Sequence, residues 1–145
     1  MENSEKIKEM VKQKYSEIAL QDKELNSSSC CGATSSCSTE VYNIMSEEYD
    51  ELNGYHTDAD LGLGCGLPTQ FAKIKKGDVV LDLGSGAGND CFVARHETGP
   101  EGKVIGVDFT PAMIAKAREN AEKLGFYNVE FRQGDIENMP ITSNV

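Results

Sequence analysis

The sequence lacks long apolar stretches, since no run approaches the roughly 20 apolar residues that a transmembrane helix needs. Its first residues, Met1 to Lys6, also lack the basic start and the apolar stretch of a secretory signal peptide. We therefore expect a cytoplasmic location. Thiols stay reduced in that compartment, so we interpret the five cysteines as free thiols and not as a disulfide framework.

Basic residues are also scarce. Lysine and arginine number 14 against 24 aspartates and glutamates, which gives a formal net charge of −10. An acidic surface repels phosphate backbones and anionic lipids, so we expect neither nucleic acid nor membranes as partners; alternatively, the charge serves solubility alone. The hydrophobic fraction of 39% and the charged fraction of 26% are typical of a globular protein, and 145 residues suffice for one small domain with a hydrophobic core.

The first part of the chain, residues 1–60, is predicted to form an N-terminal helical cap. Residues 4–20 carry apolar side chains at helical spacing, and a second helical pattern occupies residues 41–52. Between them, residues 26–39 are mostly serine, cysteine and other small residues without periodicity, which predicts a mobile loop. A glycine-rich connector at 61–68 follows.

Residues 61–145 are predicted to form a partial Rossmann-like domain. Short apolar runs at 79–83, 103–108 and 128–132 alternate with helix-compatible segments. This alternation is typical of α/β proteins with a parallel sheet and right-handed crossovers. The nearly continuous apolar run at 79–83 indicates a strand buried on both faces.

The helix after the second predicted strand has clear boundaries. Thr110 is a suitable N-cap, Pro111 suits the first helical position, and Gly125 ends the apolar stripe that starts at Met113. The chain ends soon after the third predicted strand. Open nucleotide-binding α/β sheets have more strands, so we expect a doubly wound sheet truncated after three strands, in a fragment of a longer gene product.

A glycine-rich loop, Asp82-Leu83-Gly84-Ser85-Gly86-Ala87-Gly88, directly follows the first predicted strand and leads into a helix. Glycines suit a tight turn there and let a ligand approach the backbone closely. The loop does not match the dinucleotide fingerprint G-x-G-x-x-G, because Asn89 occupies the place of the third glycine. S-adenosylmethionine fits the observed spacing Asp-x-Gly-x-Gly-x-Gly, since it has no pyrophosphate to place at a helix N-terminus.

Three acidic residues, Asp82, Asp108 and Asp135, follow the three predicted strands. We expect Asp82 to favour the cationic part of S-adenosylmethionine, electrostatically or through a hydrogen bond within the loop. Asp108 is placed to accept the ribose hydroxyls, and Asp135 to meet the adenine amino group. One such feature alone is more often a plain turn or a helix cap, but the three together indicate a cofactor site. The predicted cofactor-binding residues are Asp82, Gly84, Ser85, Gly86, Gly88, Asp108, Phe109, Met113, Asp135 and Ile136.

Residues 77–140 resemble the cofactor-binding half of a class I methyltransferase. Three segments are similar to one branch of that family, the arsenite methyltransferases: Ala59 to Gly66 with its Leu-Gly-Cys-Gly, the Asp90-Cys91 pair, and Lys103 to Asp108 followed by Thr110 to Ile114. The resemblance covers about residues 8–145 and is weakest through 26–39. It implies an S-adenosylmethionine-dependent enzyme that methylates trivalent arsenic (arsenite) and uses a thiol reductant.

The resemblance also implies roles for the cysteines. In the family, one acceptor-site cysteine lies in the Gly-Cys-Gly segment that Cys65 matches, so Cys65 is the candidate catalytic residue. Another lies near the N-terminus, where Cys30, Cys31 or Cys37 could correspond, and the arsenic(III) ligands are expected among Cys31, Cys37 and Cys65. Two further family cysteines lie beyond the third strand, where this chain has ended. We therefore expect the chain alone to bind the cofactor weakly at best and to be inactive.

Two other functions stay open. One is a class I methyltransferase that acts on a small organic or quinone-like acceptor, and the other is a non-catalytic arsenic- or metal-binding protein with the same fold. A zinc site is disfavoured because the sequence has no C-x-x-C pair. Cys91 is interpreted as a small buried hydrophobe, and His96 as a charge partner of a helix C-terminus. Tyr49 and Tyr55 flank the approach to the glycine loop, where they either cover a ligand or serve packing.

The first predicted strand carries a further expectation. In the fold that the chain resembles, this strand pairs with a fourth strand, which is missing here. An unpaired apolar edge invites pairing with another chain, so we expect the fragment to self-associate through this edge.

Overall fold

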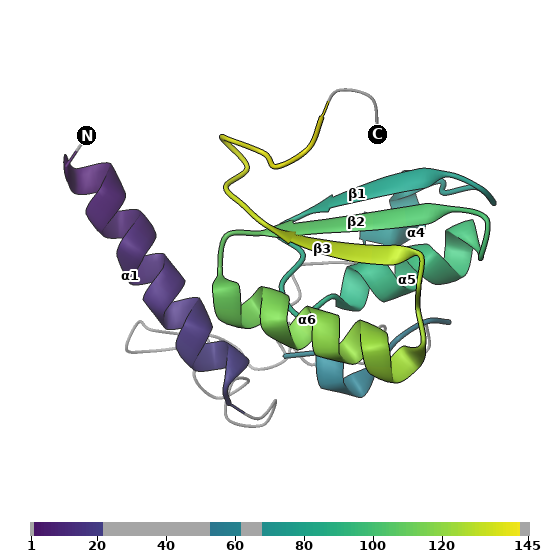
Figure 1. Ribbon diagram of the computed structural model, residues 1–145, viewed down its shortest axis with the longest axis horizontal. Coiled ribbons are helices and arrows are strands. Elements are labelled where there is room, and N and C mark those ends of the chain that lie inside the picture. Colours follow the sequence, from purple (N-terminus) through teal and green to yellow (C-terminus); the bar gives the residue numbers. More distant parts are fainter. Residues whose placement is uncertain (1, 22–52, 62–67, 143–145) are drawn as a thin grey trace.

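The computed structural model describes residues 2–21, 53–61 and 68–142 and contains a three-stranded sheet with helices beside it (Figure 1). Its elements are α1 (Glu2–Ala19), η1 (Thr57–Ala59), α4 (Pro68–Ala72), β1 (Val79–Leu83), α5 (Asn89–Thr98), β2 (Lys103–Asp108), α6 (Pro111–Leu124) and β3 (Val129–Gln133). The strands lie in the order β1-β2-β3 and run parallel, which confirms the predicted α/β class and parallel sheet. The first two strands have the predicted bounds, and β3 lies one residue later than predicted.

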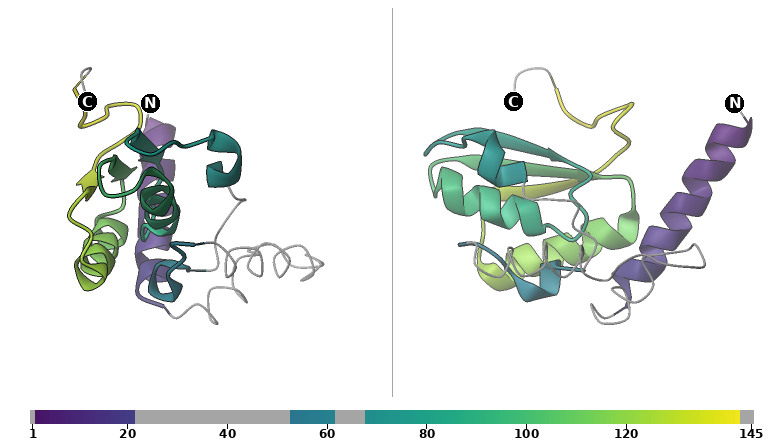
Figure 2. Two further views of the ribbon diagram at one scale, coloured as in Figure 1. Left: turned by 90° about the vertical axis from the view of Figure 1, so that its right-hand side faces the viewer. Right: turned by 180° about the vertical axis from the view of Figure 1, so that it is seen from behind.

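Both crossover helices lie on the same face of the sheet (Figure 1, and Figure 2 in the right-hand view). α5 connects β1 to β2 and packs on both, and α6 does the same for β2 and β3. Right-handed crossovers that step across a parallel sheet in one direction place their helices on one side. The order of the three strands therefore decides which face of the sheet α5 and α6 cover.

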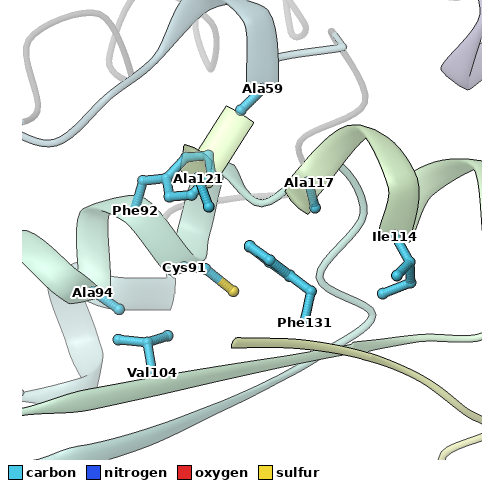
Figure 3. Close-up of a cluster of buried hydrophobic side chains, with 9 residues drawn as sticks. All are labelled: Ala59, Cys91, Phe92, Ala94, Val104, Ile114, Ala117, Ala121 and Phe131. Carbon is cyan, nitrogen blue, oxygen red and sulfur yellow. The ribbon is translucent and has the colours of Figure 1, made fainter. Parts of the chain in front are cut away.

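The hydrophobic core fills the space between this face and the two helices (Figure 3). Phe92 of α5 is fully buried, and its ring centroid lies 5.9 Å from those of both Phe126 and Phe131. The contact with Phe131 is edge-to-face, a favourable arrangement for aromatic rings. The buried cluster consists of Ala59, Cys91, Phe92, Ala94, Val104, Ile114, Ala117, Ala121 and Phe131.

The boundaries of α6 are the predicted ones. Thr110 is the N-cap, Pro111 is the first helical residue, and Gly125 follows the last turn with a φ of 67°. The Gly125 N–H donates to the carbonyl of Ala121, which closes the helix in the left-handed conformation that glycine adopts without steric cost. The side chain of Met113 is buried, as its place on the predicted apolar stripe requires.

The prediction that the strand at 79–83 is buried on both faces is wrong. Val79, Leu81 and Leu83 remain 55%, 42% and 50% exposed, whereas Val80, between them, packs against the core. The alternation arises because α5 and α6 cover one face only, and because β1 is the outermost of the described strands. A continuous apolar run therefore corresponds here to a strand with one buried and one exposed face.

Helix α1 stands beside the end of the sheet at which the strands finish (Figures 1 and 2). It starts two residues before the predicted position and packs against α6. Its last residue, Ala19, is buried in a small second cluster with Leu61, Ala87 and Met113. This contact ties the N-terminal helix to the sheet domain.

Several sequence-based predictions lie outside the described residues. These are the helical pattern at 41–52, the loop at 26–39 and most of the connector at 61–68. The division into 1–60 and 61–145 stays a prediction. Among the helices that the structure describes, none is both long enough and apolar enough to cross a membrane.

We expect Phe92→Ala to lower the free energy of unfolding by about 3–5 kcal/mol, because it removes a large buried ring and leaves a cavity between Phe126 and Phe131. Urea unfolding followed by circular dichroism measures this change. The control is Phe71→Ala in α4, where the side chain is 81% exposed and the expected change is below about 0.5 kcal/mol. Equal effects of the two substitutions would contradict the placement of the core.

Candidate functional site

A pocket of about 630 Å³ opens where the three strands finish. Its walls come from the loop after β1, the turn after β2, the segment after β3, and residues of η1 and α1. Open α/β sheets bind their ligands in this position, outside the carboxyl ends of the strands. Of the predicted cofactor-binding residues, those that line the pocket are Gly84, Ser85, Gly86, Asp108, Phe109, Met113, Asp135 and Ile136.

The glycine loop is held against β2 by backbone hydrogen bonds. The N–H groups of Gly84 and Ser85 donate to the carbonyl of Val107, at 2.8 and 3.1 Å. Gly88 is the N-cap of α5 with a φ of 99°, and a Cβ there would lie 2.7 Å from the Phe131 ring. Only glycine satisfies both conditions at position 88. Gly88 thus serves the loop's shape and does not itself line the pocket.

Asp108 connects two parts of the pocket wall. Its Oδ2 accepts a hydrogen bond from the Gly86 N–H at 3.0 Å, and its Oδ1 accepts one from the Thr110 N–H at 2.8 Å. The residue is buried, and it also lines the pocket. A carboxylate has about four acceptor positions, so Asp108 holds the loop in place and keeps acceptor capacity for a ligand.

Asp135 forms an ion pair with Lys8 of the N-terminal helix α1. Its Oδ2 accepts a hydrogen bond from the Lys8 ammonium at 2.8 Å, and its Oδ1 accepts one from the Glu137 N–H at 3.0 Å. Lys8 also pairs with the Glu137 carboxylate. The Lys8 hydrogen bond, followed by the Glu137 N–H, lowers the pKa of Asp135 below its usual value. Lys8 is a pocket residue that the sequence analysis missed, because one lysine on an amphipathic helix resembles any other.

Asp82 does not line the pocket. Its Oδ2 accepts a hydrogen bond from the Cys91 thiol, with Sγ and Oδ2 3.2 Å apart. Burial raises the pKa of Asp82 to about 6, the Cys91 hydrogen bond opposes this shift, and the charges of Asp90 and Asp108 add to it. Cys91 is fully buried in the core as predicted, but it also donates this hydrogen bond, which its interpretation as a plain hydrophobe did not include.

Two buried hydroxyls in the pocket wall lack a partner. Ser85 Oγ and Thr110 Oγ1 make no hydrogen bond within the part of the chain that the structure describes, although their residues are 7% and 1% exposed. A buried polar atom without a hydrogen bond costs free energy. Both residues line the pocket, so a polar ligand there would satisfy their hydroxyls.

The pocket wall is strongly acidic. Among the residues that the structure describes, Asp60, Asp90, Asp108, Asp135 and Glu137 line it together with one basic residue, Lys8. The Asp60 carboxylate also accepts a hydrogen bond from the Tyr55 hydroxyl at 2.8 Å. Tyr55 was expected near the approach to the glycine loop. It contacts Asp60, which lines the pocket, but Tyr55 does not line the pocket itself. Carboxylates in such numbers favour a ligand with positive charge.

These features match S-adenosylmethionine in chemical type. The acidic wall suits a ligand with a sulfonium and an ammonium group, and the partnerless hydroxyls of Ser85 and Thr110 suit its polar atoms. Phe109, Met113 and Ile136 add apolar surface for a flat base.

Of the predicted acceptor residues, Cys31, Cys37 and Cys65 lie outside the described part of the chain, as does the alternative Cys30. Within the described part, no group of three or more metal-ligating side chains occurs.

Comparison with known proteins connects the chain to methyltransferases. A family model for a methyltransferase domain matches residues 74–144. The arsenite methyltransferase of Halobacterium salinarum is 46% identical over 94% of this chain and 37% of its own length, and that of Aquipseudomonas alcaligenes is 36% identical over 90% and 36%. A solved methyltransferase from Aquifex aeolicus, dependent on S-adenosylmethionine, is 28% identical with a TM-score of 0.48, over 69% of this chain and 50% of its own. The chain thus spans 36–37% of the length of these two curated relatives.

We expect Asp108→Asn to lower the free energy of unfolding by about 1–3 kcal/mol. An asparagine has one acceptor oxygen, so its amide group would face either the Gly86 or the Thr110 N–H and leave that donor unpaired. Chemical denaturation of the purified variant measures the change. The matched control is Asp78→Asn, because Asp78 is exposed and accepts one backbone N–H, from Lys75, which asparagine also satisfies. If Asp108→Asn lowered the free energy of unfolding no more than Asp78→Asn, the role of Asp108 in joining the Gly86 and Thr110 N–H groups would be refuted.

Proposed function

Because the chain belongs to the class I S-adenosylmethionine-dependent methyltransferases, in their arsenite methyltransferase group, we propose that its pocket binds this cofactor for transfer of a methyl group to trivalent arsenic. One observation carries the proposal: the pocket gathers all the predicted cofactor-binding residues except Asp82 and Gly88. They come from the ends of three different strands and from α6.

We assign parts of the cofactor to the groups that suit them chemically. The Asp108 carboxylate has acceptor capacity for the ribose hydroxyls, and Asp135 for the adenine amino group. The backbone of the Gly84–Gly86 segment can approach the amino-acid part closely because no side chain projects from either glycine. The Lys8 ammonium donates a hydrogen bond to Asp135 Oδ2. The adenine amino group must therefore share this carboxylate with Lys8 or displace the Lys8 ammonium from it.

The chemistry of the transfer needs positioning more than proton transfer. When bound, S-adenosylmethionine supplies a methyl group on a cationic sulfur. Arsenite exchanges its oxygen ligands for thiolate sulfur, a soft ligand, and the arsenic keeps a lone pair. The methyl group would pass to this lone pair while the sulfur keeps the electrons of the broken carbon–sulfur bond, so arsenic would be formally oxidised and the thiol reductant would return it to arsenic(III). No proton would have to leave the nucleophile. The protein's part is therefore orientation and electrostatics.

We propose Cys65 as the catalytic thiol, with Cys31 or Cys37 as further arsenic ligands. Cys65 follows the pocket-lining Leu61 by four positions in the sequence, which supports the proposal. We further propose that arsenite and a thiol reductant are the small-molecule partners. The 145-residue chain by itself is expected to bind the cofactor weakly and not to turn over.

Methyl transfer tests the proposed function directly. Labelled methyl from S-adenosylmethionine is followed with and without arsenite and excess thiol, in the 145-residue chain and in a longer product of the same gene. We expect label in methylated arsenic only with arsenite present and only in the longer product. Cys65→Ser should abolish this transfer, because a hydroxyl is a poor ligand for arsenic(III).

Two outcomes separate the parts of the proposal. Cofactor binding without transfer to arsenite in the longer product would refute the arsenic acceptor and favour a small organic acceptor. Transfer that survives in Cys65→Ser would remove Cys65 from the reaction but leave arsenic as the substrate.

We also propose that the 145-residue chain self-associates through β1. This strand is the outermost of those described, and Val79, Leu81 and Leu83 expose apolar surface next to its unpaired edge. Sedimentation velocity should show dimers or larger species, and Leu81→Lys should shift them toward the monomer. Tyr127→Lys is the control, because this exposed side chain lies beyond α6 and not on β1. A monomer at all concentrations would overturn the proposal.

A further inference from the structure

Cys91 and Asp82 form a buried pair directly behind the glycine loop. Asp82 is the penultimate residue of β1, and Cys91 lies in the first turn of α5, on either side of the loop in the sequence. Sγ and Oδ2 are 3.2 Å apart, within hydrogen-bond distance for sulfur. Figure 3 shows the Cys91 sulfur pointing from α5 toward Phe131. The thiol thus borders the apolar core and donates a hydrogen bond to the Asp82 carboxylate.

The direction of this hydrogen bond follows from the charges around the pair. Burial, the charge of Asp82 and the hydrogen bond to it raise the pKa of the Cys91 thiol well above its usual value, so the thiol stays protonated and donates. The charges of Asp90 from α5 and Asp108 from β2 both raise the pKa of Asp82. The Cys91 thiol is the group that favours the ionised carboxylate.

We propose that Cys91 is a positioning residue for the cofactor site, whose thiol holds the Asp82 carboxylate ionised and oriented beneath the glycine loop. There the carboxylate adds negative charge next to a loop that lines the pocket, although Asp82 itself does not line it, and this charge favours a cationic ligand. The inference rests on the proposed function, since it assigns Asp82 a role toward S-adenosylmethionine. It also gives Cys91 a task that an apolar residue of the same size could not perform.

Three variants separate hydrogen bonding from packing. Cys91→Ser keeps a donor at nearly the same place, Cys91→Ala removes the donor and one atom, and Asp82→Asn removes the titrating group. Carbon-13 NMR of the Asp82 carboxyl measures its pKa without any cofactor. Isothermal titration calorimetry measures the affinity for S-adenosylmethionine between pH 5.5 and about 8.5, a range chosen to span the pKa of Asp82 near 6.

We expect Cys91→Ala to raise the pKa of Asp82 by about one unit, the size that loss of a single hydrogen bond to a carboxylate produces. The ionised form then becomes scarce near pH 6, so affinity there should fall about five-fold, and the deficit should nearly vanish at pH 8.5. Cys91→Ser should keep the pKa and the pH profile of the unsubstituted protein. In an Asp82→Asn background, Cys91→Ala should no longer change the pH profile.

The alternative outcomes are distinguishable. An unchanged Asp82 pKa in Cys91→Ala, or equal losses of affinity in the serine and alanine variants at every pH, would overturn the positioning role. Absence of cofactor binding by the unsubstituted longer product of the gene, alongside a shifted Asp82 pKa in Cys91→Ala, would instead count against the proposed function and leave the thiol–carboxylate coupling established.

Discussion

The two hydrogen bonds accepted by Asp108 join the loops from which the pocket is built. One oxygen binds the Gly86 N–H in the loop after β1, and the other binds the Thr110 N–H at the start of α6. Because Asp108 is itself the last residue of β2, a single buried side chain relates two neighbouring strands and a helix at one edge of the sheet. The pocket's shape therefore depends on this carboxylate.

The asymmetry of the sheet explains much of the remaining structure. Two crossover helices on one face build a core around Phe92 and leave apolar residues of β1 exposed on the other face. The pocket lies at the end of this layered unit, and α1 supplies its outer wall through Lys8, Val11 and Tyr15. The N-terminal helix thus contributes to the pocket wall, although it makes a minor contribution to the core.

Negative charge lies on both sides of the glycine loop. Asp108, Asp135 and Glu137 face the pocket, while Asp82 lies behind the loop with Cys91. From the sequence, Asp108 and Asp135 were expected to contact the ribose and the adenine, and Asp82 to act electrostatically or through a hydrogen bond within the loop. Asp82 pairs with Gly106, two residues before Asp108, so both acids lie on the same face of the sheet. Asp82 lies deeper in the sheet and contacts Cys91 of α5, whereas Asp108 ends its strand and lines the pocket.

The sequence by itself determined the features that depend on local chemistry. The bounds of β1 and β2 follow from apolar runs, the ends of α6 from Thr110, Pro111 and Gly125, and the position of the loop from its glycines. Only the tertiary structure decided the features that need a partner from elsewhere in the chain. Lys8 reaches Asp135 across 127 positions, and β1 is half exposed because of its place in the strand order. No local pattern encodes either, since each depends on which elements the fold brings side by side.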